Sequence, residues 1–157
     1  MNAKSDRARI IAPPPLLALG CIVIAFIADH FKRLPLFPTK TWLEIAVGVL
    51  LLVFAVGIVA SARRVFVAHG TNLNPYRPTN AVVVTGVYRF SRNPIYIAFM
   101  IVLLAFALFA NSLWFVLLLP LLLLMLHFGV VKREEAYLLG KFGDSYREYC
   151  DRVRRWI

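Results

Sequence analysis

The stretch "NPIYIAFMIVLLAFALFANSLWFVLLLPLLLLMLHFGVV", Asn93 to Val131, decides the fold because it runs for 39 residues without a formal charge. As one helix rising ~1.5 Å per residue it would reach about 60 Å, twice the ~30 Å hydrocarbon core of a bilayer. The chain must therefore fold back, and the polar dipeptide inside the run is Asn111-Ser112. We predict a tight helical hairpin with helices over 94–110 and 113–131.

Two further uncharged runs, 10–28 and 45–62, are long enough to cross the same core. With the hairpin they give about four transmembrane helices, near 11–30, 43–62, 94–110 and 113–131. Hydrophobic residues make up 61% of the chain and the mean hydropathy is +0.73, both high for a soluble domain. We predict an all-α integral membrane protein, a single domain over 1–157, with a loop at 63–93 and a helical tail at 132–157.

Basic residues are spread unevenly over the predicted loops. The N-terminus and the first loop hold three each, the second loop five, the hairpin turn none and the tail seven. Four spans place the N-terminus, the second loop and the tail on one side, which then has fifteen basic residues against three. By the positive-inside rule that side is predicted to be cytoplasmic.

The segment "GVYRFSRNPIY" (86–96) sets polar residues against the start of the hairpin. Asn before Pro favours a helix start, with Asn93 as N-cap and Pro94 as the first helical residue. Tyr96 lies three residues after Asn93, on the same face. Two interpretations stay open: these side chains and the arginines contact lipid headgroups, or free N–H groups together with Arg92 bind a ligand carboxylate or phosphate.

The tail "KREEAYLLGKFGDSYREY" (132–149) is predicted to continue the fourth helix beyond the membrane. Gly143 is expected to stop that helix and Asp144 to cap the next one. Adjacent residues on a helix point about 100° apart, so Glu134 and Glu135 cannot face the same way. We expect one to face solvent and the other to face the second loop.

Three smaller expectations concern local structure. Tyr146, Tyr149, Val153 and Trp156 are spaced 3, 4 and 3 apart, which predicts one apolar stripe on the last helix. Pro120 is expected to kink the fourth helix. A short strand is expected at 81–84. His127 is expected to be buried because it lies deep within the fourth helix, and to take no part in a functional site.

The hairpin brings the two polar clusters together. Because its helices are antiparallel, Asn93 and Val131 emerge on the same side. Arg92, Tyr96 and Glu134 or Glu135 are therefore predicted to converge at one cytoplasmic mouth. Such an arrangement gives a pocket for a polar cofactor, with apolar helices beneath it for a lipophilic substrate.

Other classes of function find little support in the sequence. The net charge of +10 would also suit a protein that binds nucleic acid. However, the sequence has no RNA-binding motif, zinc-finger spacing or basic recognition helix. Cys21 and Cys150 lie in different environments, so we expect neither a disulfide nor a metal site. The chain also lacks a readable Ser/His/Asp or Cys/His arrangement, which fits a transferase without a covalent enzyme intermediate.

Two motifs resemble those of the integral-membrane isoprenylcysteine carboxyl methyltransferases and their phospholipid methyltransferase relatives. "GVYRFSRNPIY" (86–96) is similar to G-x-Y-x-x-[ST]-R-[HN]-P-x-Y, and "REEAYLLGKFGDSYREYCDRVRRWI" (133–157) is similar to E-E-x-x-L-x-x-x-F-G-x-x-Y-x-x-Y. The resemblance covers roughly residues 65–157. It implies a bacterial-type enzyme of the inner membrane whose C-terminal helices enclose S-adenosylmethionine.

The same resemblance implies roles for individual residues. Arg92, Asn93 and Tyr96 would hold the methionine end of the cofactor, and Glu135 or Glu134 would approach its amino group. The remaining cofactor-binding positions are Gly86, Tyr88, Leu139, Phe142, Gly143, Tyr146 and Tyr149. Arg92 and Glu135 would be catalytic. No metal is implied.

Methyl transfer from a sulfonium requires chiefly alignment and desolvation of the reactants. The acceptor would be lipophilic, and a carboxylate, an amine and a thiol are all compatible with the motifs. Two alternatives remain at this stage. One is an NADPH-dependent enzyme like the sterol reductases, and the other is a non-enzymatic membrane scaffold whose polar clusters face lipid headgroups.

Overall fold

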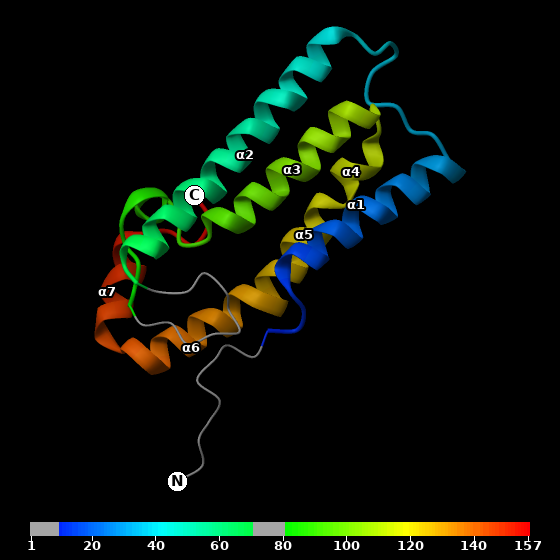
Figure 1. Ribbon diagram of the computed structural model, residues 1–157. Coiled ribbons are helices and arrows are strands. Elements are labelled where there is room, and N and C mark those ends of the chain that lie inside the picture. The colour runs from blue at the N-terminus through cyan, green and yellow to red at the C-terminus, as the bar shows by residue number, and fades with distance from the viewer. Residues whose placement is uncertain (1–9, 71–80) are drawn as a thin grey trace.

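The computed structural model describes residues 10–70 and 81–157. Every regular element in these two ranges is helical. In chain order the elements are α1 (Pro14–Phe31), α2 (Trp42–Ala68), the 3₁₀ turn η1 (Gly86–Arg89), α3 (Pro94–Ala110), α4 (Leu113–Leu117), α5 (Leu119–Leu126), the π-helical turn η2 (His127–Val131), α6 (Lys132–Phe142) and α7 (Asp144–Arg152). Figure 1 shows α2 beside α3, α1 beside α4 and α5, and both α6 and α7 gathered at one end.

The predicted hairpin is confirmed. Its first arm is α3, which begins at Pro94 with Asn93 as N-cap. The turn is made by Asn111, whose φ of 48° lies in the left-handed region that asparagine tolerates better than most residues. The chain then returns as α4, so that both arms lie side by side.

The second arm is a nearly continuous 30-residue helix from Leu113 to Phe142. It is interrupted at Leu118, two residues before Pro120, because proline lacks the N–H that would continue the backbone ladder. The expected kink at Pro120 is therefore confirmed. Beyond Val131 the arm continues as α6, which carries charged residues, whereas the arm up to Val131 carries none.

Three helices are long and apolar enough to cross a membrane: α1, α2 and the arm from Leu113 to Phe142. At 17 residues, α3 is a shorter apolar helix, about 25 Å long. The predicted all-α integral membrane protein is confirmed. The second helix runs to Ala68, six residues beyond the expected end at 62.

Three local expectations are wrong. Residues 81–84 form no strand, and the 3₁₀ turn η1 begins two residues later at Gly86. Gly143, with a φ of 54°, stops α6 as expected, but it is also the N-cap of α7, and Asp144 is that helix's first residue. The stripe ends at Tyr149 because α7 stops at Arg152 and Val153 is extended. The N-terminal nine residues and part of the loop, 71–80, lie outside the described residues.

Two groups of contacts hold the helices together. The main apolar core lies between α1, α3, α4 and α5, centred on Leu103, Phe115, Leu122 and Leu126. A smaller cluster packs Ala62 of α2 against Val83 and Tyr88. This second cluster fixes the loop that leads to residues 91–93, and therefore helps to position the site described next.

Candidate functional site

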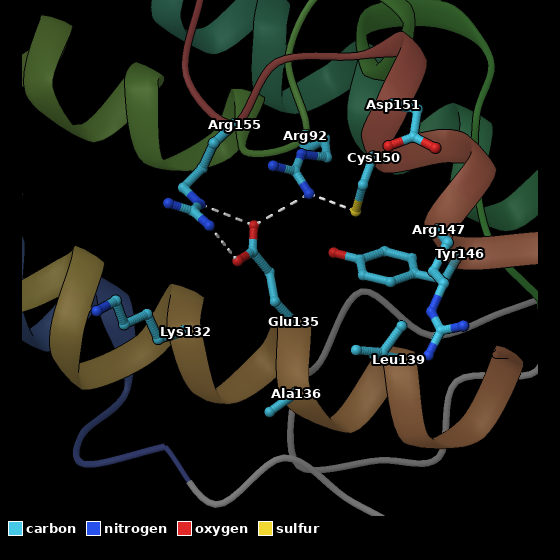
Figure 2. Close-up of a pocket in the computed structure, with 10 residues that line it drawn as sticks. All are labelled: Arg92, Lys132, Glu135, Ala136, Leu139, Tyr146, Arg147, Cys150, Asp151 and Arg155. Atoms are coloured by element: carbon cyan, nitrogen blue, oxygen red, sulfur yellow. Dashed lines mark hydrogen bonds and ion pairs between the residues drawn. The ribbon is translucent and has the colours of Figure 1, made fainter. Parts of the chain in front are cut away.

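A cavity of about 510 Å³ lies at the end of the bundle where α6 and α7 meet the start of α3. Its volume falls within the range of small-molecule sites, roughly 300–1,000 Å³. Ten residues line it: Arg92, Lys132, Glu135, Ala136, Leu139, Tyr146, Arg147, Cys150, Asp151 and Arg155. Figure 2 shows these side chains, with Glu135 pointing from α6 toward Arg92 and Arg155.

Glu135 is the centre of the polar wall. Arg155 donates from its Nε to Glu135 Oε1 at 2.9 Å and from a terminal nitrogen to Oε2 at 2.8 Å. Arg92 lies 3.3 Å from Oε1 of the same carboxylate. One acid is thus shared by two cations, and its side chain is only 17% exposed. The Glu135 carboxylate keeps the pKa of Arg155 above its ordinary value, mainly through their hydrogen bonds.

Arg92 is the more buried of the two arginines. Its side chain is 12% exposed, against 36% for Arg155. One terminal nitrogen also contacts Cys150 Sγ. Its Nε is buried and has no hydrogen-bond partner in the part of the chain that the structure describes. A buried donor without a partner is costly and in native proteins often marks a functional group.

Residues 91–93 are held by the C-terminal segment rather than by helix capping alone. Arg92 N–H donates to the Arg154 carbonyl at 3.0 Å. Asn93 Nδ2 donates to the Arg155 carbonyl at 2.8 Å, and Ser91 Oγ to the same oxygen at 3.3 Å. Asn93 is the N-cap by position, but its side chain makes no cap hydrogen bond to α3. The polar start of α3 is therefore fixed to the end of the chain.

Glu134 points away from Glu135 and forms a second polar contact. Tyr96 Oη donates to Glu134, 2.8 Å from each carboxylate oxygen. Burial raises the pKa of Glu134, an effect that the Tyr96 hydrogen bond partly offsets and the nearby Glu135 reinforces. The two glutamates diverge as expected. The expectation that one faces solvent is wrong, because both are at least half-buried.

Aromatic residues of α7 close the other side of the site. Tyr146 and Tyr149 are both 4% exposed. Tyr149 Oη donates to the Tyr88 carbonyl at 2.8 Å, which ties α7 to η1. Tyr146 lies on the cavity, across from Glu135 (Figure 2).

The structure gathers four of the predicted residues around the cavity: Arg92, Glu135, Leu139 and Tyr146. The other eight lie nearby without lining it: Gly86, Tyr88, Asn93, Tyr96, Glu134, Phe142, Gly143 and Tyr149. Gly86 has a φ of 61°, and a Cβ there would lie 2.6 Å from Val65 Cγ2. Glycine at this position is thus explained by backbone conformation and by the close approach of α2.

Six lining residues were not singled out from the sequence: Lys132, Ala136, Arg147, Cys150, Asp151 and Arg155. Helical register could have found two of them. Lys132 lies three residues before Glu135, and Cys150 lies four after Tyr146, so each shares a face with a predicted residue. Arg155 follows the end of α7, and no local pattern connects it to Glu135.

The cavity combines opposite charges with an apolar wall. Four of the ten lining residues are basic and two are acidic. Glu135 can bind a cationic group, and the excess of arginine and lysine can bind an anion. Leu139, Ala136 and the Tyr146 ring supply an apolar surface. The arrangement suits a ligand of mixed charge with an aromatic or aliphatic body.

Comparisons with known proteins find two similarities to this chain. A model of the phospholipid methyltransferase family matches residues 43–145, about two thirds of the chain. An uncharacterized protein of Haemophilus influenzae is 41% identical over 63 residues, which are 40% of this chain and 98% of that protein. The family match extends from α2 through α6 to the first residues of α7, and so includes both "SRNP" and "EE". The chain therefore belongs to the phospholipid methyltransferase family.

Proposed function

We propose that the protein transfers a methyl group from S-adenosylmethionine to a lipophilic acceptor at the cytoplasmic face of a bacterial inner membrane. The observation that carries the proposal is the cavity beside Glu135, in which one half-buried carboxylate and two arginines face an apolar wall. The acceptor's reacting group would be a carboxylate, an amine or a thiol.

The residues of the cavity fit this cofactor. The volume of about 510 Å³ suits a ligand of its size. Glu135 would bind the amino group, and Arg92, which has a buried Nε without a partner among the described residues, would bind the carboxylate. Tyr146 would face the sulfonium with its ring, since aromatic faces attract cations. Leu139 and Ala136 would contact the adenosine.

S-adenosylmethionine would supply, when bound, a methyl group on a positively charged sulfur, whose carbon a nucleophile can attack while the neutral thioether leaves. The chain's own contribution is to align the reactants and exclude water from them. Arg92 is suited to orienting a ligand because Glu135 and Cys150 hold its guanidinium, and its backbone N–H donates to the Arg154 carbonyl. Lys132 and Arg147 at the cavity would attract an anionic acceptor, and they add little attraction for an amine.

The acceptor would approach through the membrane. Beneath the cavity lie the apolar helices α3 and α5, whose buried side chains belong to the main core. The uncharged part of the second hairpin arm ends at Val131, directly before α6. The cavity would therefore sit at the boundary between hydrocarbon and water. The excess of basic residues at this end supports a cytoplasmic orientation.

The test is calorimetric titration of the detergent-purified protein with S-adenosylhomocysteine. NADPH is titrated in parallel, and the variants Glu135→Gln and Glu148→Gln are compared. Glu148 is exposed on α7 and does not line the cavity, so the same substitution there serves as the control. We expect binding of S-adenosylhomocysteine alone, weakened about tenfold or more by Glu135→Gln, because a charge-assisted hydrogen bond is lost.

Other outcomes contradict the proposal in different ways. Binding of NADPH without S-adenosylhomocysteine would support the reductase-like alternative. Binding of neither by a folded sample would support the scaffold. Equal weakening by both glutamate variants would remove Glu135 from the site and leave the cofactor assignment standing.

A further inference from the structure

The last five residues, Val153–Ile157, follow α7 without regular secondary structure, and we call them the C-terminal strap. It leaves α7 at Val153, which has φ −124° and ψ 128°. Arg155 lines the cavity, whereas the adjacent Trp156 packs against the main apolar core. The strap therefore has one polar and one apolar face.

The strap lies across the start of α3. Its carbonyls at Arg154 and Arg155 accept the hydrogen bonds from residues 91–93 described above. The Trp156 ring lies 6.3 Å from the His127 ring in the π-helical turn of the opposite arm. In Figure 1 the C-terminus returns from α7 to the beginning of α3. The strap thus occupies the boundary between the polar cavity and the apolar helices.

We propose that Trp156 controls access of the lipophilic acceptor to the cavity, and that Glu135 couples the position of Trp156 to cofactor binding. This inference rests on the proposed function. When a ligand ammonium binds Glu135, it competes with Arg155 for the same carboxylate oxygens. Arg155 then leaves, and the strap loses its only side-chain ion pair among the described residues. The strap carbonyls keep their hydrogen bonds to residues 91–93, while the Trp156 side chain withdraws from the apolar core.

The two arginines differ in a way that decides which one is displaced. Arg155 is 36% exposed and can exchange Glu135 for water, whereas Arg92 is 12% exposed and would be left buried without its acid. Arg92 also keeps its contact with Cys150 and its backbone bond to the strap. A ligand at Glu135 therefore displaces Arg155 at the lower cost in desolvation.

The coupling gives the reaction an order. With the strap in place, Trp156 packs on the main apolar core beside His127 of the π-helical turn, where it would obstruct an acceptor arriving from the bilayer. After the cofactor binds, this obstruction is removed. Trp156 is then a positioning residue whose size also limits which acceptors pass. By linkage, anything that frees the strap must strengthen cofactor binding by the same factor.

The experiment uses the full chain in phosphatidylcholine nanodiscs, with Trp42→Phe and Trp114→Phe introduced so that Trp156 is the single tryptophan. Emission of Trp156 and its quenching by iodide are recorded while S-adenosylhomocysteine is added. Calorimetry on the same sample reports binding. We expect a blue emission resistant to iodide without ligand, and a red shift with stronger quenching once the ligand is bound.

Two arginine variants in this background complete the test. Arg155→Gln should show the red-shifted, quenchable Trp156 without ligand, with no further change on titration. It should also bind S-adenosylhomocysteine about fivefold more tightly or better. Arg154→Gln is the matched control, because Arg154 is exposed and its side chain does not line the cavity. It should behave like the parent.

The outcomes separate this inference from the proposed function. Binding of S-adenosylhomocysteine with an unchanged Trp156 signal overturns the coupling and leaves the cofactor assignment intact. Weaker ligand binding by Arg155→Gln also overturns it, since Arg155 would then assist the ligand rather than compete with it. Failure of the parent to bind S-adenosylhomocysteine overturns both. Retained calorimetric binding in a variant establishes that it is folded.

Discussion

The two ends of the helix bundle are held together by different chemistry. At the turn end, the loop between α1 and α2 is fixed by hydrogen bonds that involve backbone groups, including one from the Lys40 ammonium to the Phe109 carbonyl. Asn111 accepts from the N–H groups of Leu36 and Phe37 at 3.1 and 2.9 Å and donates to the Phe37 carbonyl at 3.0 Å. Trp114 Nε1 donates to the Lys32 carbonyl at 2.7 Å. At the site end, ion pairs between side chains are added to the neutral hydrogen bonds, and they line a cavity.

In this membrane methyltransferase, the side chains that can exchange partners lie at the site end. The side-chain amide of Asn111 is satisfied on both of its atoms by backbone groups, which fixes one geometry. At the other end one carboxylate serves two arginines, and Arg92 keeps a buried nitrogen without a partner among the described residues. Buried polar groups that are only partly satisfied are expensive to maintain. Ser112 Oγ at the turn end is likewise buried without a partner among the described residues, but it is neutral and lies away from the cavity. The site end differs because its unpartnered atom belongs to a charged side chain that lines the cavity.

The largest effect is expected from Asn111→Ala at the turn end. The variant loses three hydrogen bonds, two of them exposed, and forces alanine into a left-handed conformation. We expect a loss of about 2–3 kcal/mol in stability, measured by thermal unfolding in detergent. Affinity for S-adenosylhomocysteine should not change.

Asn111→Gly is the control for the backbone contribution. Glycine adopts the left-handed conformation freely, so it should recover about 1 kcal/mol of the loss. A folded Asn111→Ala protein that had lost ligand binding would contradict the independence of the two ends.

The fold could be predicted from the sequence because its determinants are local. The uncharged run from 93 to 131 exceeds one bilayer, and Asn111 and Pro94 mark the turn and the helix start. Each of these signals acts within a few residues of the structure that it specifies. The π-helical turn at His127–Val131 had no such signal, because its residues are also compatible with an ordinary α-helix.

The site could be predicted only in part. Arg92, Glu135, Leu139 and Tyr146 follow from two motifs and from the antiparallel hairpin that joins them. Arg155 could not be predicted as the partner of Glu135, because the tail contains seven basic residues and the pairing depends on where α7 stops. Residues separated by 20 positions meet here only because Gly143 reverses the chain between two short helices.

A smaller effect, opposite in sign, is expected from Glu134→Gln at the site end. Burial raises the pKa of Glu134, so the folded state binds this proton more readily than the unfolded state. The stability that protonation contributes is complete below the ordinary carboxyl pKa and is lost as the pH rises through the raised pKa. Glutamine removes the charge and should therefore stabilise the protein at pH 8 by about 1 kcal/mol or more.

The measurement is the melting temperature in detergent at pH 5 and pH 8. Parent and variant should differ at pH 8 and converge at pH 5. Tyr96→Phe is the matched control, because it removes the hydroxyl that donates to Glu134 and should lower stability at pH 8. A Glu134→Gln protein that melted lower than the parent at pH 8 would mean that this carboxylate is stabilised by its surroundings.

The smallest effect is expected from Arg147→Gln at the rim of the cavity. Arg147 pairs with Asp144 at 3.1 Å, but the two side chains are 67% and 88% exposed. Ion pairs in water contribute little, so the change in stability should stay below about 0.5 kcal/mol. Thermal unfolding at low and high salt should give the same result for parent and variant. If Arg147→Gln destabilised the protein as much as Asn111→Ala, the rim would be a structural element, and the contrast between a fixed turn end and an adaptable site end would fail.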